Sequence, residues 1–153
     1  HVPGLHYSSL YQEALGVYCG RRHPLFASKA QGADQLKEIS ESRIVARGYM
    51  QQHDLEQLGV SKAAATVDNI EATAILIISG AYIGLLPTHF AAQWVKNGEM
   101  RQLIPNQLQL MSPFDLISRR GVVPPPILQA FLEDLAACSR QNGLDSTVFA
   151  DKS

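Results

Sequence analysis

The sequence predicts an α/β fold in which a mainly parallel sheet is flanked by helices. Residues 64–87 read as a strand, a capped helix, a glycine turn and a second strand that stops at a proline, which is the size of one βαβ unit. The helix of this unit is apolar on nearly every side, so both of its faces must be covered. Along the chain the predicted elements run β, β, α, β, α, β, α, β, β, α, which favours the same fold class.

Apolar runs between turn residues predict the elements of the first part of the chain. Residues 14–19 predict a strand that ends at Gly20. After a polar loop, residues 43–46 predict a short buried strand. A short helix is then expected to start at Asp54 and to stop at Gly59.

The βαβ unit itself consists of three predicted elements. Residues 64–67 form its first strand, and residues 83–87 form its second. Asp68 is the expected N-cap of the helix 69–79, because Glu71 stands three residues later, as in a capping box.

The remaining elements are three shorter segments and a final helix. Residues 88–97 predict a helix, and residues 103–104 and 114–118 predict strands. Three consecutive prolines then precede a helix whose apolar stripe covers residues 127–135.

Two of the predicted strands bracket everything between them. Strands 14–19 and 114–118 are placed where a chain leaves one lobe and returns to it, which predicts two lobes joined by a two-stranded hinge. Arg21-Arg22 and Arg119-Arg120 each follow one of these strands. If the strands pair, four guanidinium groups gather; a solvated cluster paired with carboxylates is favoured over an anion site.

Composition excludes several classes of protein. Hydrophobic residues make up 46% and charged residues 18%, which is typical of a globular chain. The formal net charge of -1 gives no electrostatic reason for direct contact with nucleic acid or an acidic membrane. No apolar run reaches the roughly 18 residues that a membrane span needs.

The two cysteines and the first residue bear on where the protein works. Cys19 and Cys138 are far apart and lack CxxC spacing, which favours two reduced thiols in a cytoplasmic protein. No signal peptide is recognisable. The chain starts at His1 without an initiator Met, so we expect an N-terminally truncated piece of a longer protein.

Motifs for catalysis or metal binding are missing from the sequence. The five histidines form no HxH, HExxH or HxxxH pair, and there is no GxSxG motif. Neither cysteine forms a recognisable catalytic motif with a histidine. We therefore predict no enzyme, no metal and no cofactor.

The carboxyl ends of the strands are better candidates for a site. In open parallel sheets, ligands bind beyond these ends, where helix N-termini present free N–H groups. Here the ends are residues 47–49 and 66–69. Arg47 can pair with a carboxylate, Tyr49 can stack or donate, and the first amides of the next helix can bind an anion. The alternative is that Asp68, as a cap, already uses those amides.

Several motifs resemble those of LysR-type transcriptional regulators. Residues 10–25, with Leu10, Glu13, Val17 and His23-Pro24-Leu25, are similar to the pattern L..E…V…HPL. Residues 67–103 resemble the pattern VDS…LV..G.GI.LLP…G.L..L. The resemblance covers nearly the whole chain, and the order and spacing of the pieces make it specific.

The resemblance implies an effector-binding domain, also called a substrate-binding domain, with a type 2 periplasmic-binding-protein-like fold. This fold has two Rossmann-like lobes and a two-strand hinge. Residues 1–22 and 116–150 would then be the hinge and a remnant of lobe I, and residues 23–115 would be a complete lobe II. Because part of lobe I is missing from the pattern, apolar surface is expected to be exposed.

The resemblance also implies a function and a set of partners. Such a domain binds a small-molecule metabolite effector between its lobes, in a cytoplasmic homodimer or homotetramer without a membrane. DNA is contacted only through a winged helix-turn-helix that this chain lacks. Carried over by position, the cleft residues are Tyr7, Ser8, Arg47, Gly48, Tyr49, Thr66, Asp68, Asn69 and Ile117.

Two alternatives stay open on the sequence alone. The first is a stand-alone solute-binding protein or an enzyme built on the same bilobal fold, which the missing signal peptide and acid/base pair disfavour. The second is a dimerisation fragment that uses the helix 88–97, with Phe90 and Trp94, as its interface.

Overall fold

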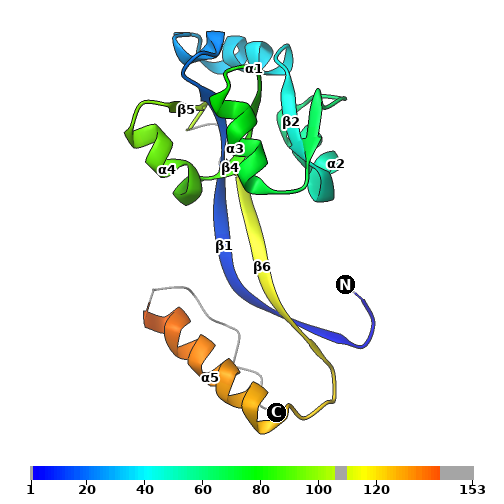
Figure 1. Cartoon of the computed structure of the whole chain (residues 1–153). Helices are drawn as coiled ribbons and strands as arrows, with labels where there is room; N and C mark the ends of the chain where they lie inside the picture. The colour runs from blue at the N-terminus through cyan, green and yellow to red at the C-terminus, as the bar shows by residue number, and fades with distance from the viewer. Residues whose placement is uncertain (1, 106–109, 142–153) are drawn as a thin grey trace. The chain divides into compact units, whose positions relative to one another are not determined.

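The structure is a computed structural model that describes residues 2–105 and 110–141 (Figure 1). Within these residues five α-helices, two short 3₁₀ helices and six strands are formed. In chain order they are β1 (Leu5–Gly20), η1 (Pro24–Phe26), α1 (Gly32–Ser40), β2 (Ile44–Arg47), η2 (Gly48–Met50), α2 (Gln51–Leu58), β3 (Ala65–Val67), α3 (Ile70–Ile78), β4 (Ile83–Pro87), α4 (Thr88–Lys96), β5 (Met100–Leu103), β6 (Leu110–Arg119) and α5 (Pro126–Gln141).

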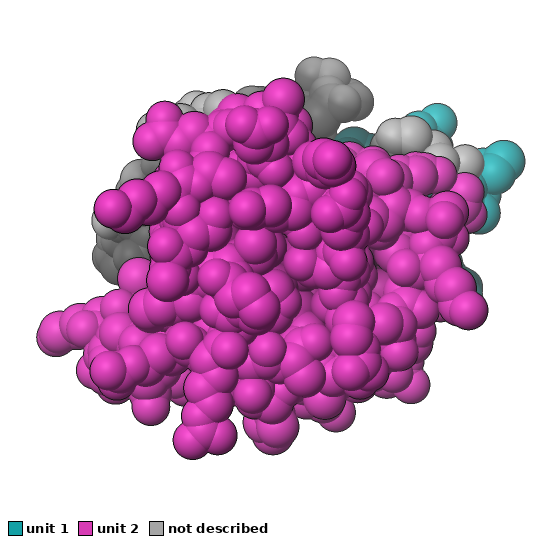
Figure 2. Space-filling view, turned by 90° about the horizontal axis from the view of Figure 1, so that it is seen from above, with its two compact units in different colours: residues 1–13, 111–153 teal, residues 14–110 magenta. Residues whose placement is uncertain are grey.

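The chain divides into two compact units (Figure 2). Unit 2 is residues 14–110, and unit 1 is residues 1–13 together with residues 111–153. The predicted lobe boundaries at residues 22/23 and 115/116 do not coincide with these unit boundaries, and the division into lobes stays a prediction. Residues 15–20 belong to unit 2 because they pair with strands of that unit on both sides.

Unit 2 contains a mixed sheet in the order β3-β2-β4-β1-β5. β2 is parallel to β3 and to β4, whereas β1 is antiparallel to β4 and to β5. The α/β class is confirmed, but the expectation of a mainly parallel sheet is wrong. Hydrophobic patterns report the burial of a strand and not its direction, so the sequence could not show that β1 runs against its neighbours.

Helices cover both faces of this sheet (Figure 1). Side chains of β1 alternate between the faces, as strand geometry requires. Val17 and Cys19 pack in one core cluster with Ile39 of α1 and with residues of α2. Tyr18 packs in the other cluster with residues of α3 and α4. α3 packs on the sheet through Ala74 and Ile77, but Ile75 is 67% exposed, so the expectation that both faces of this helix are covered is wrong.

One helix was predicted as a polar loop. α1 buries only two side chains, Gln35 and Ile39, and the first of them is polar. A helical pattern is recognised by apolar residues at helical spacing, and here an amide occupies one of the inward positions. The strand predicted at residues 103–104 is also shifted, because β5 ends at Leu103 and Ile104 has a positive φ of 43°.

The return strand β6 pairs with β1, but not where the sequence suggested. In unit 1 the rings of Tyr11 and Phe114 stack at 4.6 Å, and the Arg120 N–H donates to the Gly4 carbonyl at 2.9 Å. Residues 17–19 already have β4 on one side and β5 on the other. The pairing of strand 14–19 with strand 114–118, which the sequence left open, is therefore not available to residues 17–19, and the contacts with β6 are made by the first part of β1.

Unit 1 exposes much apolar surface. Val123 is 87% exposed, and Ile127 and Phe131 of α5 are 83% and 57% exposed. The predicted apolar stripe of α5 is thus only partly covered, which agrees with the exposed surface that the motif pattern led us to expect. In the part of the chain that the structure describes, no helix has both the length and the apolar character needed to cross a membrane.

His23 couples the stability of unit 2 to pH. Its Nδ1 accepts a hydrogen bond from the Leu25 N–H at 3.2 Å, which caps η1, and burial lowers the pKa of the imidazole below its ordinary 6.5. The unfolded chain therefore binds this proton more readily than the folded chain does. The stabilisation is complete above about pH 6.5 and is lost as the pH falls toward the folded pKa.

The expected result is a larger fall in Tm for the wild type than for His23→Asn between about pH 7.5 and about pH 5.5. Asn keeps a capping acceptor but does not titrate, so it isolates the effect of His23 from the other histidines. Equal losses of Tm in the two proteins would contradict this assignment.

Candidate functional site

Most of the predicted effector-binding residues lie at one edge of the sheet in unit 2. β3 lies parallel to β2, with Ala46 beside Thr66 and Arg47 beside Val67. Because parallel strands end at the same edge, the residues that follow them are neighbours there. We call residues 47–49 and 66–69 the carboxyl edge.

Gly48 brings the two loops of the carboxyl edge close together. A Cβ at this position would overlap Oδ1 of Asp68 and would touch Cγ2 of Thr66 at 3.4 Å. Tyr49 is 63% exposed, and Thr66, Asp68 and Asn69 are exposed as well. Their phenol, hydroxyl, carboxylate and amide groups are therefore accessible to a ligand.

Arg47 is engaged inside the protein. Only 5% of the residue is exposed, and its Nη2 and Nε bind the Asp54 carboxylate at 2.6 and 3.0 Å. The backbone N–H of Arg47 donates to the same carboxylate at 3.0 Å. Burial acts to lower the pKa of the guanidinium, but the hydrogen bonds and the charge of Asp54 outweigh it and raise the pKa above its ordinary value.

The expectation that Arg47 pairs with an effector carboxylate is therefore corrected. Asp54 already balances its charge, so the pair fixes the end of β2 to the first turn of α2. Above the pair, the Tyr49 ring lies 5.8 Å from the Arg47 guanidinium carbon, which orients the phenol at the carboxyl edge.

The sequence did not predict that Asp54 is the partner of the buried Arg47 guanidinium. It was expected to start a helix, whereas α2 begins at Gln51 and Asp54 lies in its first turn, 2% exposed. The available signal was an arginine at the end of a buried strand with an aspartate seven residues later. That spacing alone does not show that the two side chains meet.

The N-cap of α3 is Asn69 and not Asp68. The Asn69 side-chain oxygen accepts a hydrogen bond from the Ala72 N–H at 2.7 Å, and the backbone carbonyl of Asn69 accepts one from the Thr73 hydroxyl at 3.2 Å. The cap lies one residue later than predicted, since the extended backbone that a cap requires is found at position 69, and the predicted capping box is not formed because Ala72 then occupies its third position. Asp68 is thereby released to lie against Gly48.

The cap leaves part of the helix N-terminus open. The amides of Ile70 and Glu71 have no carbonyl partner within α3, because the first N–H groups of any helix lack one. The carboxylates of Asp68 and Glu71 stand close to them in the sequence. The carboxyl edge thus combines N–H groups, which donate hydrogen bonds, with carboxylates, which accept them. A ligand bound there can form hydrogen bonds with donors and with acceptors.

Three predicted residues belong to unit 1. The Tyr7 hydroxyl accepts from the Val2 N–H at 3.0 Å, and the Ser8 hydroxyl lies 3.0 Å from Nε2 of His6. Ile117, in β6, is 54% exposed. The structure does not bring these three together with the carboxyl edge within one unit, so their role in the site stays a prediction.

Metal binding and nucleophilic catalysis find little support in the described residues. Residues 2–105 and 110–141 include no cluster of three or more His, Cys, Asp or Glu that could hold a metal ion. Cys19 is buried, and burial raises the pKa of its thiol to about 11, so it is a poor nucleophile at neutral pH.

The fold and the carboxyl edge define a ligand-binding α/β domain, and comparison with known proteins identifies its family. The chain belongs to the LysR substrate binding domain family, whose model matches residues 1–138. This is the effector-sensing domain of LysR-type transcriptional regulators, so the family inferred from the motifs is confirmed.

A curated relative agrees with this assignment. The chain is 34% identical over 137 residues to the HTH-type transcriptional activator BauR of Pseudomonas aeruginosa. The match covers 88% of this chain and 44% of that protein, so the chain spans less than half the length of its relative. The family and this relative are regulators and not enzymes, which favours the sensing role over the alternatives.

Solved structures show the same fold at low sequence identity. The regulatory domain of CcmR from Synechocystis PCC6803, in complex with 2-PG, has a TM-score of 0.70 and 20% identity, with 89% of this chain and 67% of that chain covered. The regulatory domain of MetR from N. meningitidis has a TM-score of 0.70 and 14% identity, with 95% and 69% covered.

Proposed function

We propose that this chain senses a small-molecule effector for a DNA-binding transcriptional regulator. The whole protein would act in the cytoplasm as a homodimer or homotetramer and would contact DNA through a separate helix-turn-helix. The family and its relatives support this role. The carboxyl edge supports the location of the effector, because accessible polar side chains and open helix amides converge there.

The arrangement also bears on how the effector is held. The Arg47 charge is balanced by Asp54, so recognition rests on hydrogen bonds from the carboxyl edge and not on a free cation. Thr66 and Asn69 supply neutral polar groups, and Tyr49 supplies an exposed ring. A small polar metabolite, smaller than a peptide, fits this set of groups.

Binding alone would not regulate transcription. An effector shifts a protein between two arrangements only if it binds one of them more tightly than the other. The two connections between units 1 and 2, at residues 13/14 and 110/111, are the places through which such a difference could pass. We propose that β1 and β6 couple effector binding to the arrangement of the two units. β1 continues across the connection at residues 13/14, and β6 begins at the connection at residues 110/111.

The substitution Gly48→Ala tests the carboxyl edge. The new methyl group would push away the Asp68 carboxylate, which is the movable end of a side chain, so the fold should tolerate it. The displaced carboxylate then intrudes on the ligand, and we expect effector affinity to fall by about tenfold or more, which corresponds to about 1.4 kcal/mol. A thermal-shift screen of aliphatic and aromatic acids and amino acids finds the effector, and calorimetry measures its affinity.

Gln93→Ala is the matched control, because Gln93 is an exposed residue of α4 and lies outside the carboxyl edge. It should bind the effector as tightly as the wild type. An effector that Gly48→Ala binds with unchanged affinity would place the site elsewhere.

A further inference from the structure

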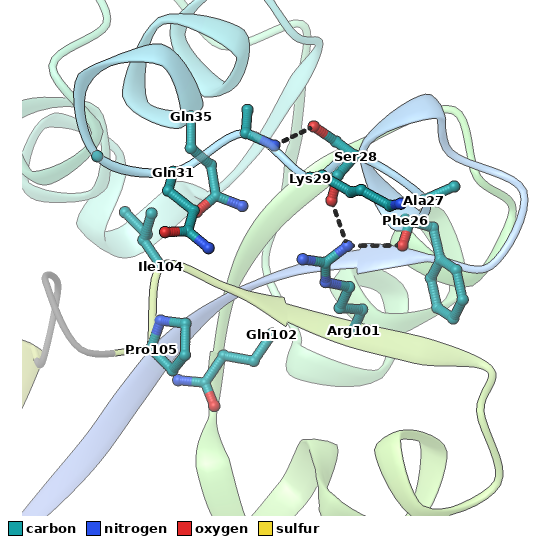
Figure 3. Close-up of a pocket in the computed structure, with 12 residues that line it drawn as sticks. Phe26, Ala27, Ser28, Lys29, Gln31, Gln35, Arg101, Gln102, Ile104 and Pro105 are labelled. Carbon is teal, nitrogen blue, oxygen red and sulfur yellow. Dashed lines mark hydrogen bonds between the residues drawn. The ribbon is translucent and has the colours of Figure 1, made fainter.

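Unit 2 contains a pocket of about 720 Å³ that shares no residue with the carboxyl edge (Figure 3). Residues 26–32 and Gln35 form one side of its lining, and residues 101–102 and 104–105 form the other. It therefore lies where the loop after η1 and the first turn of α1 face β5, the last strand of the sheet order.

Arg101 is held rigidly in the wall of this pocket. Its Nη1 donates to the carbonyl oxygens of Phe26 and Ser28, each at 2.8 Å (Figure 3). The other guanidinium nitrogens have no hydrogen-bond partner among the residues that the structure describes. An arginine fixed by one nitrogen keeps its remaining donors for a carboxylate or phosphate, which its planar fork matches well.

The charge of the lining has one sign. Lys29, which is exposed, is the second cation, and no carboxylate side chain is found among the described residues that line the pocket. Glu38 touches the lining from outside, and its carboxylate already accepts a hydrogen bond from the Ser28 hydroxyl at 2.8 Å. A pocket with two cations and no anion attracts negatively charged ligands.

Gln35 is the observation that points most directly to a ligand. It is 6% exposed, lines the pocket, and extends from α1 toward it (Figure 3). Its amide makes no hydrogen bond to the described residues, and none of the side-chain nitrogens and oxygens described there is fully buried without a partner, so the amide group is accessible from the pocket. A ligand in the pocket can therefore bond the donor and the acceptor of this amide in place of water.

The N-terminus of α1 opens on the same space. Its N-cap residue, Gln31, makes no hydrogen bond from its side chain to the helix, and both Gln31 and Gly32 line the pocket. Gly32 has a φ of 59°, which lets the chain turn sharply into the helix. The uncapped N–H groups of the first turn carry the positive end of the helix dipole, which favours an anion, although Asp34 in the same turn offsets part of this charge without lining the pocket.

We propose that this pocket is a second ligand site, for a small metabolite that carries a carboxylate or phosphate group. Arg101, Lys29 and the first turn of α1 hold the anionic group, and the Gln35 amide bonds a neutral polar part of the same molecule. The pocket shares no residue with the carboxyl edge. The proposal of a second site therefore does not depend on where the effector binds or on which effector it is.

Titration of the ¹⁵N-labelled chain with inorganic phosphate and, separately, with succinate tests the site by NMR. At least one anion should shift the Gly32 amide and the Gln35 side-chain amide saturably. Lys29→Glu should weaken that binding by about tenfold or more, whereas Lys62→Glu, the same charge reversal at an exposed residue outside the pocket, should change it by less than about twofold. Whichever of phosphate and succinate binds with the higher affinity shows whether the site prefers a phosphate or a carboxylate group.

Gln35→Leu separates a ligand-binding role from a structural one. Leu keeps the size of the side chain but removes the amide donor and acceptor, so this variant should keep a Tm close to that of the wild type while binding the anion about tenfold more weakly. The proposal is overturned if neither anion gives saturable shifts, if Lys29→Glu and Lys62→Glu bind equally well, or if Gln35→Leu keeps the wild-type affinity.

Discussion

Replacing Asp54 with Ala should reduce the free energy of unfolding by about 3–5 kcal/mol, because it leaves the Arg47 guanidinium charged and buried without a partner. Three hydrogen bonds are lost together: two from the guanidinium and one from the Arg47 backbone N–H. A whole domain is stable by only about 5–15 kcal/mol, so this single change removes a large share of it. Urea denaturation of the wild type and the variant measures the difference.

The double variant Arg47→Met with Asp54→Leu provides the control. It removes both charges and refills the space with apolar side chains, so its stability should lie within about 1–3 kcal/mol of the wild type, the remaining loss coming from the backbone N–H at position 47 that has no acceptor. If the double variant were as unstable as Asp54→Ala, the loss would come from packing or from the Arg47 backbone N–H, and not from the stranded charge.

The same pair connects stability to the proposed site. The Asp54 carboxylate fixes the end of β2, from which Gly48 and Tyr49 continue into the carboxyl edge. We therefore expect the double variant to fold and yet to bind effector more weakly, because Tyr49 loses the guanidinium under its ring. If the effector site did not depend on the Arg47–Asp54 pair, the double variant would bind effector as tightly as the wild type.

Local patterns predicted the parts of this fold that depend on local chemistry. The strand at residues 83–87 is found as predicted, and so is the helix at residues 88–97 to within one residue, because an apolar run and a proline mark their ends. The cap of α3 was missed by one residue, since Asp68 and Asn69 are both good caps and only the backbone conformation decides between them.

Long-range pairing was outside the reach of the same patterns. Nothing in residues 14–19 shows that β4 and β5 occupy both edges of this strand, nor that β6 meets β1 nearer to Tyr11. The ion pair between Arg47 and Asp54 is a comparable case, because its formation depends on where α2 packs. The helix α1 was not predicted because Gln35, a polar residue, occupies an inward position where packing alone would select an apolar side chain. The same property makes Gln35 a candidate ligand-binding residue.

Gly20→Ala is the second change that should strongly destabilise the protein. A Cβ at Gly20 would overlap the backbone oxygen of Ile77 and would lie 3.1 Å from the Cα of Ile78. Both atoms belong to the last turn of α3, and the Ile77 oxygen also accepts the Gly80 N–H at 3.0 Å. Since no side chain can rotate away, α3 itself must move, and we expect a loss of about 3 kcal/mol or more in the free energy of unfolding.

Gly59→Ala shows what a glycine substitution costs without such a clash. Gly59 ends α2 with a φ of 65°, and nothing lies within 4 Å of an added Cβ. Its replacement should cost only about 1–2 kcal/mol, the penalty of a left-handed conformation. Chemical denaturation of the two variants compares them directly. Equal losses in the two variants would mean that the contact between β1 and α3 can relax. A clearly larger loss for Gly20→Ala means that the fold requires the close packing of α3 on the sheet. The same packing places the N-terminus of α3 at the carboxyl edge.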